Sequence, residues 1–182
     1  MVIPVMAQRE AEPSTFEVRN ELFAPDGKLL QTFKKKVTLK AGETRRMELQ
    51  SMLISNPEIW TPETPILYKV VTSLVNTKTR NVIDEKSHKV GFAGFHSMAE
   101  GILLEWEALQ VAWFQPSSGL GTVGVALPDE AHRRDIRLLK EMGSNYIRIS
   151  HYPQDDALLD ACDELGLLAW EEIEYYQLGL HE

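Results

Sequence analysis

Two pairs of side chains that could take part in catalysis or binding lie where short apolar runs of the sequence end. Arg148 and His151 close one such run, and Glu171 and Glu172 close the next one along the chain. A guanidinium favours the ionised form of an acid beside it, whereas an isolated histidine at a strand end is more commonly a hydrogen-bonded structural residue. Two carboxylates could share acid and base work on one bond, but neighbouring residues of a strand point to opposite faces. We therefore assign neither glutamate as catalytic, and the importance of Arg148 and His151 depends on the elements that hold them.

Helices and short strands alternate in the part of the chain that carries these residues. From Ala126 the apolar period changes from two to about 3.6, with Ile136, Leu139 and Met142 forming one stripe. The expected elements are a helix from 129 to Gly143, a strand over 145–149, a helix over about 155–166 and a strand over 167–170. This alternation is typical of a parallel sheet with crossover helices. A complete barrel of this kind needs about 250 residues, so we expect only part of one here.

The chain before residue 93 is patterned differently, with period-two alternation and frequent turns. Strands are expected over 16–22, from Val37 to Leu39 and from Leu67 to Val75, and Asp26-Gly27 supplies a hairpin turn. The segment 56–65 holds three prolines, which remove ladder donors, so it must cross between sheets. Turn signals at this spacing predict an antiparallel β-sandwich of immunoglobulin type. The expected domains are a sandwich over 1–93, with its first strands cut short, and the start of a barrel over 94–182.

Composition and charge exclude several classes of partner. The chain has 182 residues, with 19 Lys and Arg against 27 Asp and Glu, for a formal charge of −8. This balance argues against nucleic-acid binding and against an anionic membrane surface, and Lys34–Lys36 is interpreted as a solvated strand face. No run approaches the roughly 18 apolar residues of a membrane span. Met1–Pro4 lacks the features of a signal peptide, so we expect a soluble protein, cytoplasmic or exported with its targeting segment missing from this chain.

Several residues that invite a functional interpretation are better explained structurally. Cys162, the single cysteine, has the spacing of a buried small hydrophobe and excludes an intramolecular disulfide. Trp60, flanked by prolines, could stack on a sugar, but a structural role is favoured. The remaining histidines show no metal-ligand spacing and are interpreted as surface residues: His88, His96, His132 and His181.

Motifs along nearly the whole chain resemble glycoside hydrolase family 2, and within it most closely the β-galactosidases. The barrel part carries Ala126-Leu127-Pro128-Asp129-Glu130, Arg134-Asp135-Ile136, Leu139-Lys140-Glu141-Met142-Gly143, Asn145, Ile147-Arg148, Ser150-His151-Tyr152-Pro153 and Cys162-Asp163-Glu164-Leu165-Gly166-Leu167. The sandwich part carries Asp26-Gly27-Lys28, Ala41-Gly42-Glu43, Asn56-Pro57, Trp60, Pro62-Glu63-Thr64-Pro65, Leu67-Tyr68 and Gly91-Phe92. These independent motifs follow the family's order and spacing, which makes the resemblance specific.

The resemblance implies a multi-domain architecture, an all-β immunoglobulin-like sandwich followed by an incomplete (β/α)8 TIM barrel. It implies a retaining glycosidase acting on β-galactoside-like carbohydrate, with Arg148 near the nucleophile, His151 on sugar hydroxyls and Glu172 shaping the sugar pocket. An ordinary rim carboxylate is an equal alternative for Glu172. The family takes both catalytic glutamates from later barrel strands, so no catalytic residue is assigned and this chain alone is expected to be inactive. We expect no cofactor, and no metal, because the family's ligands are not recognisable after the third strand.

One stretch departs from the family pattern. After Gly101-Ile102-Leu103-Leu104 the family reads N-G-x-P-x-K-L-R-G-x-N-R-H, ending in a sugar-contacting histidine, whereas residues 105–117 read EWEALQVAWFQPS. These residues can be encoded by bases that, read one nucleotide later, give N-G-K-P-S-K-L-R-G-F-N-R-H-Q-D-W. The first base of each shifted codon is largely set by the observed residue, so agreement over the whole run is hard to attribute to chance. We hypothesise a reading-frame slip near Glu105 that is undone near Thr122; true divergence is the alternative.

Two further functional classes stay open beside the partial glycosidase. One is a noncatalytic carbohydrate-binding module, in which Arg148, His151 and an aromatic residue would converge. The other is a structural role for the sandwich. An incomplete barrel would also leave apolar residues uncovered, and we expect Leu167, Leu168 and Trp170 to be exposed and the chain to form homo-oligomers or aggregates.

Overall fold

Two compact units make up the chain. A computed structural model describes residues 5–7, 12–47, 54–98, 101–104, 107–108, 127–149 and 153–172. The first unit contains residues 1–57 and 68–90, and the second contains residues 58–67 and 91–182. The segment 58–67 therefore lies between two parts of the first unit in sequence but belongs to the second unit in space.

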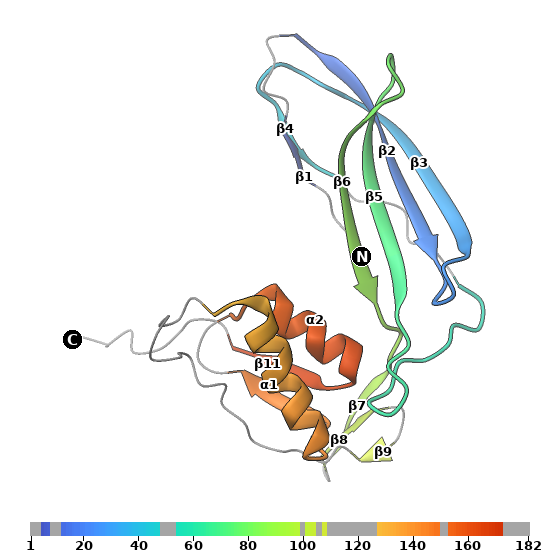
Figure 1. The fold of residues 1–182 in the computed structure, drawn as a ribbon. Coiled ribbons are helices and arrows are strands. Elements are labelled where there is room, and N and C mark those ends of the chain that lie inside the picture. The colour runs from blue at the N-terminus through green and yellow to red at the C-terminus, as the bar shows by residue number, and fades with distance from the viewer. Residues whose placement is uncertain are drawn as a thin grey trace, which may run out of the picture. The chain divides into compact units, whose positions relative to one another are not determined.

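Antiparallel strands form the first unit. Its main sheet has the order β3 (Leu29–Leu39), β2 (Ser14–Phe23), β5 (Tyr68–Asn76) and β6 (Val82–Val90), as Figure 1 shows. A second, two-stranded sheet pairs β1 (Val5–Ala7) with β4 (Thr44–Arg46). The predicted strands and the immunoglobulin-like sandwich class are confirmed. The segment that follows β4 leads to β5 in the other sheet, as its prolines predicted.

The β2–β3 hairpin forms where the sequence places its turn. Gly27 adopts a φ of 84°, and its N–H donates to the Ala24 carbonyl at 2.9 Å. A side-chain oxygen of Asp26 accepts from the Lys28 N–H at 2.9 Å and closes the turn. Alternation then directs one face of the hairpin into a core of Val18, Val37, Leu39 and Met47. The predicted solvated face is confirmed, because all three lysines of the 34–36 run are exposed.

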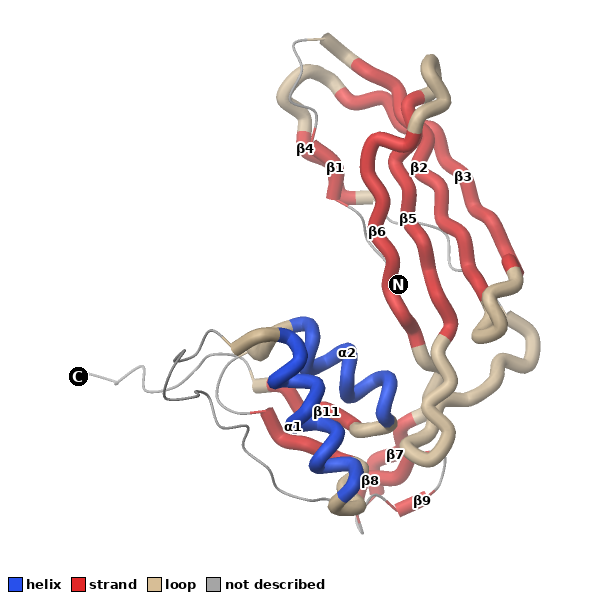
Figure 2. The backbone as a smooth tube through the Cα atoms, viewed as in Figure 1, coloured by secondary structure: helices blue, strands red, loops and turns tan. Residues whose placement is uncertain are grey.

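The second unit begins with short antiparallel strands and continues with alternating helices and strands. Its elements are β7 (Phe95–Met98), β8 (Gly101–Leu104), β9 (Glu107–Ala108), α1 (Asp129–Glu141), β10 (Tyr146–Ile149), α2 (Asp156–Leu165) and β11 (Leu168–Glu171). Strands β10 and β11 are parallel, with Tyr146 opposite Leu168. Figure 2 shows α1 and α2 on one side of this strand pair. The predicted start of a TIM barrel is confirmed, and β9 is the only part of the proposed out-of-frame passage among the described residues.

Helix α2 is capped at both ends by residues of types that commonly begin and end helices, and its C-terminal cap determines where β11 starts. At its first turn, a side-chain oxygen of Asp155 accepts from the Ala157 N–H at 2.8 Å. At its end, Gly166 adopts a φ of 79°, and the N–H groups of Gly166 and Leu167 donate to the Cys162 carbonyl at 3.0 and 2.9 Å. The chain then enters β11 at Leu168, whose N–H donates to the Asn145 carbonyl.

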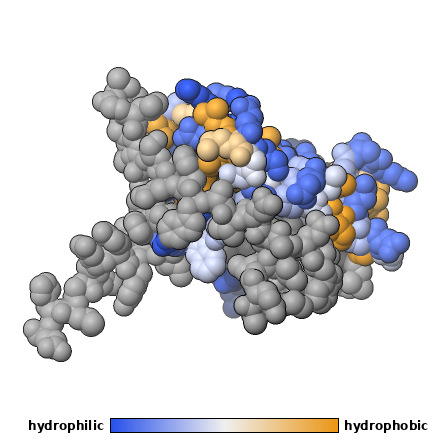
Figure 3. Space-filling view, turned by 90° about the horizontal axis from the view of Figure 1, so that it is seen from below, coloured by the Kyte–Doolittle hydropathy of each residue, from blue (hydrophilic) through white to orange (hydrophobic). Residues whose placement is uncertain are grey.

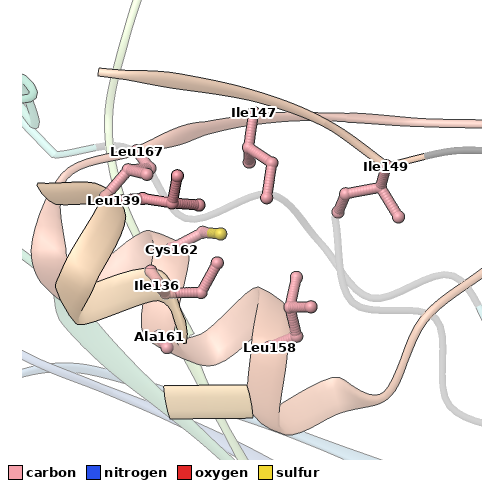
Figure 4. Close-up of a cluster of buried hydrophobic side chains, with 8 residues drawn as sticks. All are labelled: Ile136, Leu139, Ile147, Ile149, Leu158, Ala161, Cys162 and Leu167. Carbon is pink, nitrogen blue, oxygen red and sulfur yellow. The ribbon is translucent and has the colours of Figure 1, made fainter. Parts of the chain in front are cut away.

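One apolar core joins the two helices to the two strands. Figure 4 shows the Ile147 and Ile149 side chains pointing from β10 toward residues of both helices, among them Ile136 and Leu158. The core consists of Ile136, Leu139, Ile147, Ile149, Leu158, Ala161, Cys162 and Leu167. The expectation that Leu167 is exposed was wrong: it is 1% exposed, because it precedes β11 and packs beneath the helices.

The residues of helix α1 that face this core differ in part from those that the sequence pattern predicted. Met142 was predicted on the apolar stripe but is 79% exposed, since it follows the last helical turn. His132 was interpreted as a surface residue but is 7% exposed. It lies one helical turn before Ile136, so the buried stripe runs through His132, Ile136 and Leu139.

On the face of β10–β11 opposite the helices, the described side chains range from partly buried to exposed. Leu168 is partly buried and Trp170 is 53% exposed, which confirms Trp170 as an exposed apolar residue. Within the described ranges, β10 and β11 pair only with each other. A two-stranded sheet is marginal by itself, whereas the main sheet of the first unit has four strands.

We expect this difference to control both association and hydrogen exchange. Amides in residues 126–170 should exchange faster than those in residues 30–90, and the chain should self-associate through β10 and β11. Hydrogen exchange with mass spectrometry, together with light scattering, measures both properties. A monomer in which the two segments are equally protected would contradict the prediction.

Hydropathy varies over the described part of the surface. On the face seen in Figure 3, hydrophilic residues lie among smaller hydrophobic areas. Neither α1 nor α2, the helices within the described ranges, is long and apolar enough to cross a membrane.

Candidate functional site

Arg148 and Glu172 form an ion pair on the face of β10–β11 opposite the helices. Ile147 and Ile149 point into the core, so the residue between them, Arg148, points the opposite way. In the parallel register Arg148 lies opposite Trp170, and Glu172 follows two residues later on the same face. The two side chains therefore meet where the strands end, which in barrels is the face that carries active sites.

The geometry of this pair is tight. Both Nε and Nη2 of Arg148 contact Oε1 of Glu172 at 2.5 Å. The side chains are 31% and 21% exposed, so the pair is partly shielded and its charges are screened less than those of a surface ion pair. The Glu172 N–H also donates to the Ile149 carbonyl at 3.2 Å, which ties the residue to the end of β10. A carboxylate held in this way has a defined orientation toward the strand ends.

Tyr146 lies one pleat before Arg148 on the same strand face. Burial is the main cause that raises the pKa of its phenol, and the nearby Glu172 carboxylate adds to it, while Arg148 opposes them. The phenol is therefore neutral near pH 7 and can donate a hydrogen bond. Together the three side chains offer a neutral donor, a cation and an anion along one strand face.

Glu171 and Glu172 are separated as predicted. A side-chain oxygen of Glu171 accepts from the Gln154 N–H at 3.2 Å, whereas Glu172 contacts Arg148. The adjacent glutamates thus have different partners and cannot flank one bond. The pairing of Arg148 with Glu172 itself was not predicted. Its signal was present in the sequence, because two in-register parallel strands place residues 148, 170 and 172 on one face.

The other candidate residues have mixed outcomes. His151 lies outside the described residues, so its assignment stays a prediction. His88 is exposed as predicted, and His96 and His181 lie outside the side chains that the structure describes. Trp60 is 5% exposed, which leaves no open ring face for a sugar, so its structural interpretation is confirmed. Among the described residues no three His, Cys, Asp or Glu side chains gather to hold a metal ion, and the expectation of no metal stays a prediction.

Cys162 is confirmed as a core residue, and its chemistry can be predicted from that position. Its Sγ lies between the helices and β10 in Figure 4, and burial raises the pKa of the thiol from its usual 9.0 to about 12. At pH 8 we expect the native thiol to react with a disulfide reagent roughly a thousandfold more slowly than the denatured thiol, because its thiolate fraction is lower by about that factor. Equal rates in the native and denatured protein would contradict this placement.

The same pKa shift predicts how stability depends on pH. The unfolded thiol ionises near pH 9 and the folded thiol near 12, so the contribution of Cys162 to stability is complete below pH 9 and falls as the pH rises to 12. The limiting slope is about 1.4 kcal/mol per pH unit. Urea unfolding of the second unit at several pH values measures this slope, and Cys162→Ala should flatten it.

Comparison with known proteins identifies this combination of a sandwich and barrel strands as that of a class of glycoside hydrolases. The model "Glycosyl hydrolases family 2" matches residues 3–92, and the model of the family's TIM barrel domain matches residues 121–182. The chain belongs to glycoside hydrolase family 2. The two matches leave out residues 93–120, which contain most of the stretch proposed to be out of frame.

Relatives and solved structures agree with this assignment. The chain is 35% identical to a β-galactosidase of Thermoanaerobacter pseudethanolicus over 137 residues, or 74% of this chain and 18% of the relative. It is 31% identical to a β-glucuronidase of Bacteroides fragilis over 162 residues, or 87% of this chain and 23% of the relative. A crystal structure of a Bacteroides uniformis β-glucuronidase aligns with a TM-score of 0.88 and 46% identity, covering 94% of this chain and 21% of that one. The chain thus spans about a fifth of the length of these proteins.

Proposed function

We propose that this chain is part of a retaining β-glycosidase and that Arg148, His151 and Glu172 contribute to its substrate pocket. The Arg148–Glu172 pair at the carboxyl ends of β10 and β11 is the observation that carries the proposal. A carboxylate oriented by a guanidinium can accept hydrogen bonds from sugar hydroxyls. The catalytic carboxylates come from barrel strands that follow, as the family resemblance implies.

Two substrate classes fit the relatives. β-Galactosides are the class that the sequence motifs favoured, and a β-galactosidase is among the relatives. β-Glucuronides are the second candidate, because identity to the B. uniformis β-glucuronidase reaches 46% over 94% of the chain. Assays of the full-length gene product on chromogenic β-galactoside and β-glucuronide distinguish them, and hydrolysis of neither would contradict the proposal.

Adjacent glutamates provide a matched test of the site. In the full-length protein Glu172→Gln should lower kcat/KM about 10- to 100-fold, since charged hydrogen bonds contribute about 1.5–3 kcal/mol. Glu171→Gln should leave it unchanged, because the amide retains an oxygen for the Gln154 N–H. Equal kcat/KM values for the two variants would place the pocket elsewhere.

The noncatalytic alternatives make different predictions. A carbohydrate-binding module would bind immobilised galactoside or glucuronide as the 182-residue chain, and His151→Ala would abolish that binding. If the chain has only the structural role of its sandwich, it should bind neither sugar. Replacement of Arg148 or Glu172, which lie in the second unit, should then leave the activity of the full-length protein unchanged.

A further inference from the structure

The segment 58–67 docks on the end of helix α2 through Trp60. The indole Nε1–H donates to the Asp163 carbonyl at 2.8 Å, and the Trp60 N–H donates to the Phe92 carbonyl at 2.8 Å. Gly91 lies directly against the ring: a Cβ on Gly91 would sit 2.9 Å from the Trp60 side chain. Asp163 lies in the last turn of α2, where helix carbonyls commonly accept from groups outside the helix, and the Trp60 indole is such a donor.

Lys140 binds the same segment to the start of β11. Its ammonium donates to the Pro62 carbonyl at 2.6 Å and to the Gly166 carbonyl at 3.0 Å. Gly166 allows this approach, since a Cβ there would lie 2.1 Å from the Pro62 oxygen. One lysine on α1 therefore holds together the docked segment and the residue that ends α2. Its cation also lies at the negative end of the α2 dipole, where a positive charge is stabilising.

The position of Gly166 determines which side chain reaches Arg148. Strand β11 has four residues and starts two residues after Gly166. Side chains alternate along a strand, so a slip of one residue would turn Glu172 toward the helix side and bring Glu171 to the face of Arg148. A four-residue ladder resists such a slip weakly, and a clamp at Gly166, just before the ladder begins, resists it directly.

We propose that Lys140 and Trp60 are positioning residues that hold the start of β11 so that Glu172 meets Arg148. The segment 58–67 then has a role in the second unit although it is encoded between strands of the first. This inference concerns how the ion pair is held and does not depend on whether the pair binds a sugar.

The rate at which Arg148 is chemically modified measures whether it is paired with Glu172 in the 182-residue chain. Phenylglyoxal modifies arginines, and peptide mass spectrometry gives the rate at each one. Glu172→Gln should raise the rate at Arg148 about tenfold, the factor expected for the loss of a charged hydrogen bond, and Glu171→Gln should not. Lys140→Met should raise it by a similar factor, and Lys140→Arg, which keeps a donor, should restore it to near the original rate.

A matched control and a second variant keep the test decisive. Arg137→Met removes a cation from the same helix, where Arg137 pairs with the exposed Glu130, and should leave the Arg148 rate unchanged. Hydrogen exchange of the α1 and α2 amides is measured in parallel. If Lys140→Met unfolds the helices, Trp60→Phe is used in its place. This variant removes the indole N–H donor but keeps an aromatic ring, and it should also raise the modification rate at Arg148. An unchanged Arg148 rate, or one that rises only in step with helix exchange, would overturn the proposal.

Discussion

A polypeptide of these 182 residues should hydrolyse neither a chromogenic β-galactoside nor a β-glucuronide above background. A retaining glycosidase needs two carboxyl groups about 5–5.5 Å apart, one on each side of the scissile bond. The adjacent Glu171 and Glu172 do not provide them, because one contacts the Gln154 N–H and the other contacts Arg148. Enzymes accelerate such reactions about 10⁶-fold or more, so loss of the catalytic pair should bring turnover down to the limit of detection.

The full-length gene product, assayed beside the short chain at equal molar concentration, is the positive control. Contaminating host glycosidase is the main source of a false signal, and repurification should remove it. Turnover that survives repurification and disappears with His151→Ala would show that the chain carries a complete site, contrary to this prediction.

Restoring the family motif at residues 105–117 should raise the activity of the full-length protein substantially. The repair replaces EWEALQVAWFQPS with NGKPSKLRGFNRH and returns a histidine to position 117. The family resemblance implies that this residue contacts the sugar, so we expect kcat/KM to increase by about 10- to 100-fold, the range of one charged hydrogen bond. The gap between the two family matches, residues 93–120, supports this choice of segment.

Repair should also improve the solubility of the short chain. On the hypothesis of a reading-frame slip, Trp106, Trp113 and Phe114 stand in a segment that was not selected to pack as a barrel strand, and Pro116 lacks a backbone donor. These residues lie outside the described ranges, apart from the two-residue strand β9.

Two controls separate the causes. The same repair with alanine at position 117 should recover solubility but not activity, because it restores the strand without the histidine. Sequencing the source DNA tests the origin of the change, since codons incompatible with the shifted reading would exclude a frame slip. If the repair changes neither property, the present residues are a working alternative.

Periodicity and turn chemistry were enough to predict most of the elements. The helix expected from 129 ends at Glu141, and the strands expected over 145–149 and 167–170 are β10 and β11. The hairpin at Gly27 also forms as predicted. These features depend on residues close together in sequence, where steric preference and alternating burial act directly. The family motifs then joined the elements into a sandwich and a barrel.

Contacts between distant residues could not be obtained in this way. Leu167 and His132 were expected at the surface and are buried, and Met142 was expected in the core and is exposed. The three errors have the same cause. His132, Met142 and Leu167 lie in or beside the first or last turn of a helix or the first residue of a strand, and a residue in such a place is buried only if another element packs over it. Local pattern does not contain that information.

The candidate site shows the same division. Sequence alone excluded Glu171 and Glu172 as a catalytic pair, because strand alternation is a local property. The family resemblance, and not residue type, pointed to Arg148 and Glu172 as substrate-binding residues. The tertiary structure decided that Arg148 and Glu172 contact each other, and that Lys140 and Trp60 hold the junction before β11. Those contacts join residues 24 to 103 positions apart, and they form only when packing of the apolar core sets the register of parallel strands.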